Sequence, residues 1–257
     1  MLKIKLDITK SLEQNAGMYF EKAKKAKKKL EGAEEALNNS LNKLEKVKLE
    51  QSKEISKVKE KVLVKKEWYE KFRWFISSEG FLCIGGRDAT TNEIVIKKHT
   101  DKEDIVFHTS IAGSPFFVIK TEGKKVSEST LNETAQATAA YSRAWKLGLS
   151  MQEVFYVNPE QVSKKANSGE FIGRGAFMIY GKKNFITPEI KLAIGIKNSK
   201  IIGGPVEAVK VNSDKSVVII QGREKASAVA KKIIKKIGGG DVDDIIRMLP
   251  AGGCSLV

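Results

Sequence analysis

Cysteine and histidine are scarce in this sequence of 257 residues, which contains only Cys83, Cys254, His99 and His108. These four residues show no zinc-ligand spacing, and two cysteines give no disulfide framework, which fits a reducing compartment. Neither histidine stands beside a serine or cysteine in a nucleophile context, and no motif of paired carboxylates occurs. We therefore expect no enzyme and no bound metal.

Long apolar runs are also missing. The segment Met1–Leu6 has no extended apolar core, so we expect no signal peptide. No stretch approaches the ~18 apolar residues that a membrane helix needs. The expected location is the cytoplasm, with no membrane partner.

Positive charge, by contrast, is abundant: 46 Lys and Arg face 31 Asp and Glu, for a net charge of +15. An excess of this size favours an anionic partner, either nucleic acid or a membrane surface. A general lysine bias of the source is the alternative that composition leaves open. The apolar share of 41% is sufficient for a folded core.

Residues 1–67 are predicted to form a short strand and a lysine-rich coiled-coil arm. Leu2, Ile4 and Leu6 alternate as in a strand, and Thr9 or Ser11 can cap a helix that continues to about residue 62. Apolar residues then recur in steps of three and four from residue 12 to 37, the pattern of a coiled-coil seam, and beyond residue 37 the seam loosens as at a stutter or a turn. Such a helix needs a partner, supplied by a fold-back or by another chain.

The same arm contains six lysines within residues 22–29. Their mutual repulsion favours contact with phosphates, and a solvated helix face is the alternative. We take Lys24, Lys25, Lys27 and Lys28 as candidate RNA contacts.

Residues 68–188 are typical of a mixed α/β domain. Its opening, residues 68–75, is expected to continue the helix into an aromatic anchor. Thr130 and Glu133 suggest a capping box that begins another helix. Strands are predicted at residues 81–84, 94–98, 105–108, 116–119, 154–157 and 176–180.

Residues 189–257 are predicted to be a small β-rich extension that also contains helices. Short apolar runs occupy residues 192–196, 206–211 and 217–220. An amphipathic helix follows at residues 224–237, and Asp241 caps a last short helix. The expected fold class for the whole chain is therefore α+β.

Two glycine-rich segments carry an arginine: Gly85-Gly86-Arg87 and Gly173-Arg174-Gly175. Neither has the residues of a P-loop or of a dinucleotide turn, so no nucleotide cofactor is predicted. Glycine lets a backbone approach a phosphate while arginine clamps it, although an ordinary turn explains the pattern equally well.

A basic pair, Lys182-Lys183, follows a predicted strand and precedes Phe185. Lysines beside an aromatic residue suit looped or single-stranded RNA, in which bases stack and phosphates are neutralised. A solvated turn with Phe185 in the core is the alternative.

Several ordered blocks of the predicted α/β domain form a recognisable pattern: residues 68–80, 85–88, 91–93, 104–108, 113–115, 169–171 and 175–185. They resemble the RNA-binding domain of the NFACT family (NFACT-R), which includes the nuclear export mediator factor and bacterial proteins similar to fibronectin-binding protein A. The match extends over nearly all of residues 68–188, and the ending Gly-Lys-Lys-Asn-Phe resembles the archaeal and eukaryotic branch. The arm and the tail are also similar to that family, whereas its N-terminal tRNA-reading domain has no counterpart here.

The resemblance implies a role in ribosome-associated quality control. Family members hold a large ribosomal subunit with peptidyl-tRNA and support addition of a C-terminal tail to the stalled chain. The implied partners are rRNA and tRNA, with a separately encoded N-terminal half or a second copy pairing with the arm. An RNA-binding accessory of a tRNA or rRNA modification system is the alternative. The candidate RNA-binding residues in the domain are Arg87, Asn92, His108, Lys164, Lys165, Arg174, Lys182 and Lys183. For His108, at the end of a predicted strand, a structural hydrogen bond is the alternative.

Overall fold

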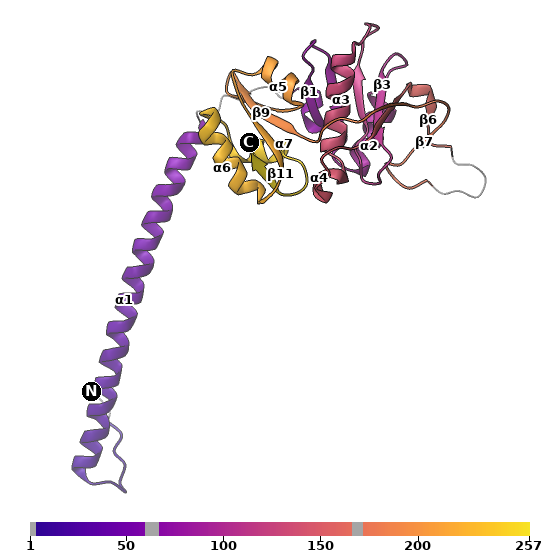
Figure 1. The fold of residues 1–257 in the computed structure, drawn as a ribbon. Helices are drawn as coiled ribbons and strands as arrows, with labels where there is room; N and C mark the ends of the chain where they lie inside the picture. The colour runs from indigo at the N-terminus through magenta and orange to yellow at the C-terminus, as the bar shows by residue number, and fades with distance from the viewer. Residues whose placement is uncertain (1–3, 60–66, 166–171) are drawn as a thin grey trace. The chain divides into compact units, whose positions relative to one another are not determined.

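The computed structural model describes residues 4–59, 67–165 and 172–257, with side chains omitted at 49–59. The chain divides into two compact units, residues 1–65 and residues 66–257, which we call the arm and the body. Helices and strands of the body alternate irregularly, and every paired strand is antiparallel. The predicted α+β class is confirmed (Figure 1).

The arm is one continuous helix, α1 (Leu12–Lys59), preceded by an extended segment (Figure 1). Ser11 is the cap: its hydroxyl accepts a hydrogen bond from the Gln14 amide, and the Gln14 side chain accepts one from the Ser11 amide. Helix formation here follows from a run rich in Lys, Glu, Ala and Leu without proline. The rest of the predicted helix, residues 60–62, lies outside the described residues.

The predicted strand at the start of the arm is wrong for residues 4–6, and residues 1–3 are outside the described range. Residues 4–10 instead lie against the first turns of α1. Buried Asn15 donates to the carbonyls of Asp7, Lys10 and Ser11, and Tyr19 donates to the Lys5 carbonyl at 2.6 Å. These side-chain partners satisfy the backbone without a neighbouring strand.

The body is built on a six-stranded sheet in the order β1-β2-β4-β3-β5-β8. Its register pairs Phe107 with Phe117 and with Tyr156 across neighbouring strands. The predicted strands at 81–84, 105–108, 116–119 and 154–157 are confirmed to within one residue. The strands are β1 (Arg73–Ile76), β2 (Leu82–Gly85), β3 (Ile105–Thr109), β4 (Phe117–Lys120), β5 (Val154–Val157) and β8 (Asn184–Ile186).

Helices cover both faces of this sheet. Alanines of α3 (Glu128–Ala140) pack with Phe107 and Phe117, whereas Val95 of α2 (Ala89–Lys98) packs with Val106. Successive residues of a strand point to opposite faces, so α2 and α3 lie on opposite sides. The α2 side also carries the two-stranded ribbon of β6 (Val162–Ser163) and β7 (Met178–Ile179).

A second sheet, in the order β10-β9-β11-β12, forms the C-terminal part of the body. Its strands are β9 (Leu192–Lys197), β10 (Lys200–Gly204), β11 (Lys215–Glu224) and β12 (Cys254–Leu256). The amphipathic helix is confirmed as α6 (Ala226–Ile237), and Asp241 does cap α7 (Val242–Met248). The apolar run at 206–211 forms a helix, α5 (Val206–Asn212).

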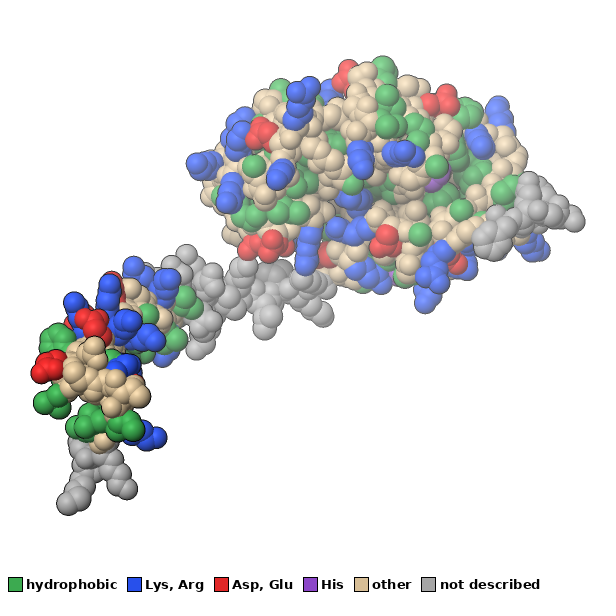
Figure 2. Space-filling model, turned by 90° about the horizontal axis from the view of Figure 1, so that it is seen from below, with side chains coloured by type: hydrophobic (Ala, Val, Ile, Leu, Met, Phe, Trp, Pro, Cys, Tyr) green, Lys and Arg blue, Asp and Glu red, His purple; other side chains and the backbone are tan. Residues whose placement is uncertain are grey.

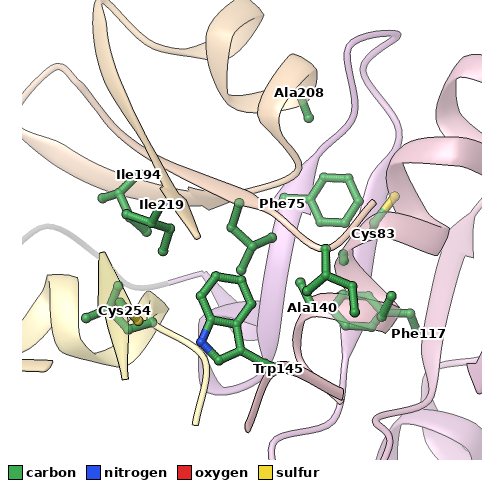
Figure 3. Packing of buried hydrophobic residues seen from close by; sticks show 14 of the residues in the cluster. Phe75, Cys83, Phe117, Ala140, Trp145, Ile194, Ala208, Ile219 and Cys254 are labelled. Carbon is green, nitrogen blue, oxygen red and sulfur yellow. The ribbon is translucent and has the colours of Figure 1, made fainter. Parts of the chain in front are cut away.

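One hydrophobic cluster joins the two sheets. It contains Phe75, Phe117 and Trp145 from the first part together with Ile194 and Ile219 from the second (Figure 3). Trp145, in α4 (Arg143–Leu147), is fully buried and donates to the Gly253 carbonyl at 3.0 Å. The predicted boundary at residue 188 therefore falls inside a continuous core.

Three local predictions in the body are wrong. Residues 94–98 belong to α2 because the Asp88 carboxylate caps that helix at the Thr91 amide, despite a β-branched run. The expected helix at 68–75 is only a short 3₁₀ turn, η1 (Trp68–Lys71), followed by β1. Helix α3 begins earlier than Thr130, with Ser127 as its cap, and Thr130 is buried within it.

The 3₁₀ turn η2 (Pro159–Gln161) precedes β6. Strand β7 covers only two residues of the strand predicted at 176–180. None of the helices in the described ranges is long and apolar enough to cross a membrane.

Candidate nucleic-acid interface

A pocket of about 440 Å³ opens between the N-terminal end of α2, the end of β3 and the 173–177 segment. Four of the predicted site residues line it, although they are far apart in the sequence: Arg87, Asn92, His108 and Arg174. Tyr141, Phe116 and Phe177 supply aromatic surface in the lining. We call this feature the arginine pocket.

His108 forms part of an aromatic wall. Its ring stacks on Phe116 with centroids 4.1 Å apart and planes 26° apart. Burial, together with the nearby positive charge of Lys183, lowers the pKa of His108 to about 4. At neutral pH the imidazole is therefore uncharged, and it is hydrogen-bonded to the backbone of Thr109 and Ser114.

An aromatic row continues from His108 across the sheet. His108 of β3 is directly opposite Phe155 of β5, which is opposite Phe185 of β8. Directly opposite residues lie on the same face. Phe185 is 55% exposed, so it does not point into the core, and Lys183 Nζ lies 4.5 Å from the centroid of the Phe155 ring. This row offers stacking surface beside positive charge.

The floor of the arginine pocket is organised by the end of α7. Arg73 donates to the Leu249 carbonyl, Arg87 to the Arg247 carbonyl, and Tyr141 to the Met248 carbonyl. The last carbonyls of a helix have no partner within the helix, and cations are favoured there. The C-terminal part of the chain thus orients the pocket's arginines.

Arg73 and Arg87 share this floor. The Arg73 guanidinium lies 3.9 Å from the centroid of the Tyr141 ring, and Arg87 also donates to the Phe72 carbonyl at 3.0 Å. Burial lowers the pKa of both arginines, and the charge of Arg73 lowers that of Arg87 further. The floor therefore concentrates positive charge in a partly dehydrated site.

The loop that carries Arg174 is fastened to α2. Glu93 accepts a hydrogen bond from the Gly175 amide, and Lys164 Nζ lies 3.4 Å from Glu93 and donates to the Gly173 carbonyl. A hydrogen bond from the Lys97 side chain has the largest effect on the pKa of Glu93. Together with the Gly175 amide and the charge of Lys164, it lowers that pKa to about 2. Arg174 itself is exposed on the wall of the pocket.

Asn92 is buried, and its side-chain amide forms hydrogen bonds with the backbone of the pocket wall. Its oxygen accepts from the Phe116 amide at 3.0 Å, and its nitrogen donates to the Ser114 carbonyl at 3.4 Å. These bonds hold the 114–116 segment against α2. The geometry therefore gives Asn92 a supporting position rather than an open donor or acceptor pair.

The remaining predicted lysines fall in three places. Lys164 helps to fasten the Arg174 loop to α2, and its Nζ lies 4.7 Å from the centroid of the Phe177 ring. Lys165 and Lys182 are exposed beside β6 and β7, where their carbonyls accept from Tyr180 and Gln161. The candidates of the arm, Lys24, Lys25, Lys27 and Lys28, are all exposed on α1.

Sequence reasoning missed Arg73, Tyr141 and Phe155. Each lies in a mostly apolar stretch that is typical of a protein core. Their place in the site depends on segments that are distant in the sequence and come together only in the folded protein. One usable signal was the rarity of arginine, because Arg73 and Arg87 are two of only six in the chain.

Figure 2 shows a face of the body that is hollowed beside a histidine, with lysine and arginine side chains on either side of the hollow. Acidic side chains are fewer on that face. Positive charge around a concave, partly aromatic surface is the arrangement expected of a site for a nucleic-acid strand.

Comparison with known proteins identifies the domain that contains the arginine pocket. Residues 71–181 match the model of the NFACT protein RNA binding domain. The archaeal Rqc2 homologue aRqcH of Methanocaldococcus jannaschii is 45% identical over 208 residues, 78% of this chain and 31% of that protein. The Drosophila melanogaster homologue of the ribosome quality control complex subunit NEMF is 35% identical over 75% of this chain and 20% of that protein.

A solved structure, the C-terminal part of the fibronectin/fibrinogen-binding protein from Streptococcus suis, matches with a TM-score of 0.39 and 18% identity, over 50% of this chain and 49% of that chain. The chain spans about a third or less of the curated relatives named above. Within that span the resemblance found in the sequence is confirmed: the chain belongs to the NFACT family and carries its RNA-binding domain.

Proposed function

We propose that this chain is a non-catalytic, cytoplasmic RNA-binding component of ribosome-associated quality control. It binds the large ribosomal subunit that carries peptidyl-tRNA and supports C-terminal tailing of the stalled nascent chain. The peptidyl transferase centre of the ribosome supplies the chemistry, and this chain holds RNA. The archaeal Rqc2 homologue and the Drosophila relative, which is named as a homologue of a ribosome quality control complex subunit, support this assignment.

The observation that carries the proposal is the convergence of predicted RNA-binding residues on one face. Arg87, His108 and Arg174 line one pocket, and the aromatic row leads from it to the Lys182-Lys183 pair. Stacking surface supports unpaired bases, and lysines and arginines neutralise the backbone. The lysines of α1 add a second basic surface for the same class of partner.

RNA affinity is expected to fall steeply with salt, because bound lysines and arginines release condensed counterions. Replacing Lys182 and Lys183 by alanine should flatten the log–log salt dependence by about 1.5–2, one phosphate for each lysine. A matched variant with Lys231→Ala and Lys235→Ala removes the same charge from the exposed face of α6. If the two double variants show the same log–log dependence of RNA affinity on salt, a phosphate contact at Lys182 and Lys183 is contradicted.

Sedimentation through sucrose separates the proposal from a modification accessory. The chain should travel with isolated large subunits that carry peptidyl-tRNA, and less with empty ones. Binding to free tRNA without any large-subunit association would instead favour the accessory module of a tRNA or rRNA modification system.

The exposed apolar side chains of α1 need a helix to pack against. We propose a separately encoded N-terminal NFACT half in the cell, or a second copy of the chain in isolation. The exposed apolar seam of α1 supports this proposal.

A further inference from the structure

Arginine is concentrated at one place in a chain that otherwise uses lysine. The sequence has six arginines among 46 basic residues, and Arg73, Arg87 and Arg174 all line the arginine pocket. Arg247 borders it closely enough for its charge to lower the pKa of Arg87. Half of the arginines, against none of the lysines, thus line one cavity of the body.

These arginines lack carboxylate partners. Every ion pair among the described residues uses a lysine. Asp88 is the acidic residue in the lining, and its carboxylate is occupied by Thr91 at the start of α2. Like charges in a partly dehydrated site are unfavourable until a counter-charge arrives. The site is therefore prepared for an anion.

The identity of the side chains points to a phosphate. A guanidinium has five N–H donors in a planar fork that fits two phosphate oxygens, whereas lysine acts as a point charge. Two donors of Arg87 and one of Arg73 bind backbone carbonyls, which fixes both planes. The Arg73 guanidinium is also hydrogen-bonded to Tyr141, whereas the remaining donors of Arg87 and those of Arg174 have no partner in the described part of the chain.

The rest of the wall suits a base. The cavity of about 440 Å³ lies within the range of roughly 300–1,000 Å³ of small-ligand pockets. Neutral His108, stacked on Phe116, and the ring of Phe177 provide flat surfaces. RNA-binding proteins read unpaired nucleotides by stacking and by base-edge hydrogen bonds.

From this combination we infer that the arginine pocket takes one unpaired nucleotide of an RNA strand, with its phosphate on Arg174 and the floor arginines and its base against His108 and Phe177. The inference rests on the proposed RNA-binding function and adds its recognition element: a bulged or looped nucleotide rather than continuous duplex. The aromatic row then guides the neighbouring nucleotides toward Phe185.

The test compares two RNA hairpins that differ by a single bulged nucleotide, measured by fluorescence anisotropy at fixed salt. The full chain should bind the bulged hairpin roughly ten-fold more tightly, as one stacked base allows. Arg174→Ala and Arg174→Lys should both remove most of this preference, since the second keeps the charge without the fork. Arg223→Ala, an exposed arginine outside the pocket, should leave the ratio unchanged.

Equal affinity of wild type for the two hairpins would overturn the inference while leaving RNA binding intact. So would an Arg174→Ala variant that weakens both RNAs equally. Binding of a nucleoside monophosphate alone, with no preference between hairpins, would identify a free-nucleotide site and also overturn it. If the full chain binds neither hairpin, the proposed RNA-binding function itself is contradicted.

Discussion

His108 connects the chemistry of one residue to the stability of the fold. Its pKa is lowered from 6.5 to about 4, chiefly by burial, so the folded state keeps the ring neutral. Between these values the unfolded chain binds a proton that the folded chain does not. Stability should therefore be fully present above pH 6.5 and fall as the pH drops toward 4, by up to about 3 kcal/mol.

Urea unfolding of wild type and His108→Gln at several pH values checks this expectation. The difference in free energy of unfolding between the two proteins should change across pH 4 to 6.5 and level off above it. His99→Gln is the control, because burial lowers that histidine's pKa as well and its contribution must be separated. A difference that is constant with pH would show that His108 titrates normally.

At the scale of elements, the Arg174 loop depends on a glycine. Gly175 has φ +75°, and a Cβ there would lie 2.5 Å from Ala89 Cα at the start of α2. Gly175→Ala should cost about 1–2 kcal/mol from the backbone alone and displace Arg174 from the pocket. Gly173→Ala is the matched control, since nothing lies within 4 Å of its Cβ position. Equal melting temperatures and RNA affinities for the two variants would contradict this account.

The elements also show what the sequence could and could not reveal. Short continuous apolar runs predicted β3 and β5 closely, because each is flanked by turn or polar residues. The strand prediction at residues 94–98 was wrong because Ile94, Val95 and Ile96 are β-branched, which favours a strand. The Asp88 cap is the local signal for the helix that forms instead. The glycine-rich segment 173–175 brought Arg174 to attention, and His108 lies in a block that resembles the family. The support that α7 gives to Arg87 joins residues 160 positions apart, which no local pattern predicts.

On the scale of the whole molecule, the arm exposes an apolar seam along a helix of 48 residues, about 72 Å at 1.5 Å per residue. Leu30 and Leu37 are each 60% exposed, and Leu41 and Leu44 are exposed to a similar degree. Burial of each such side chain contributes roughly 1.5–3 kcal/mol. A surface of this kind favours pairing with a second helix.

In isolation we expect the chain to self-associate through this seam at micromolar concentration, as a two-fold antiparallel pair that buries the same stripe on both copies. Leu37→Glu should weaken the pair by more than ten-fold, because it places a charge in the buried seam. Asn39→Glu adds the same charge about 200° around the helix, away from the seam, and should leave association unchanged. Analytical ultracentrifugation decides: a monomer for the wild-type chain would exclude self-pairing of the arm, whereas a dimer sensitive only to position 37 would establish the seam as the contact.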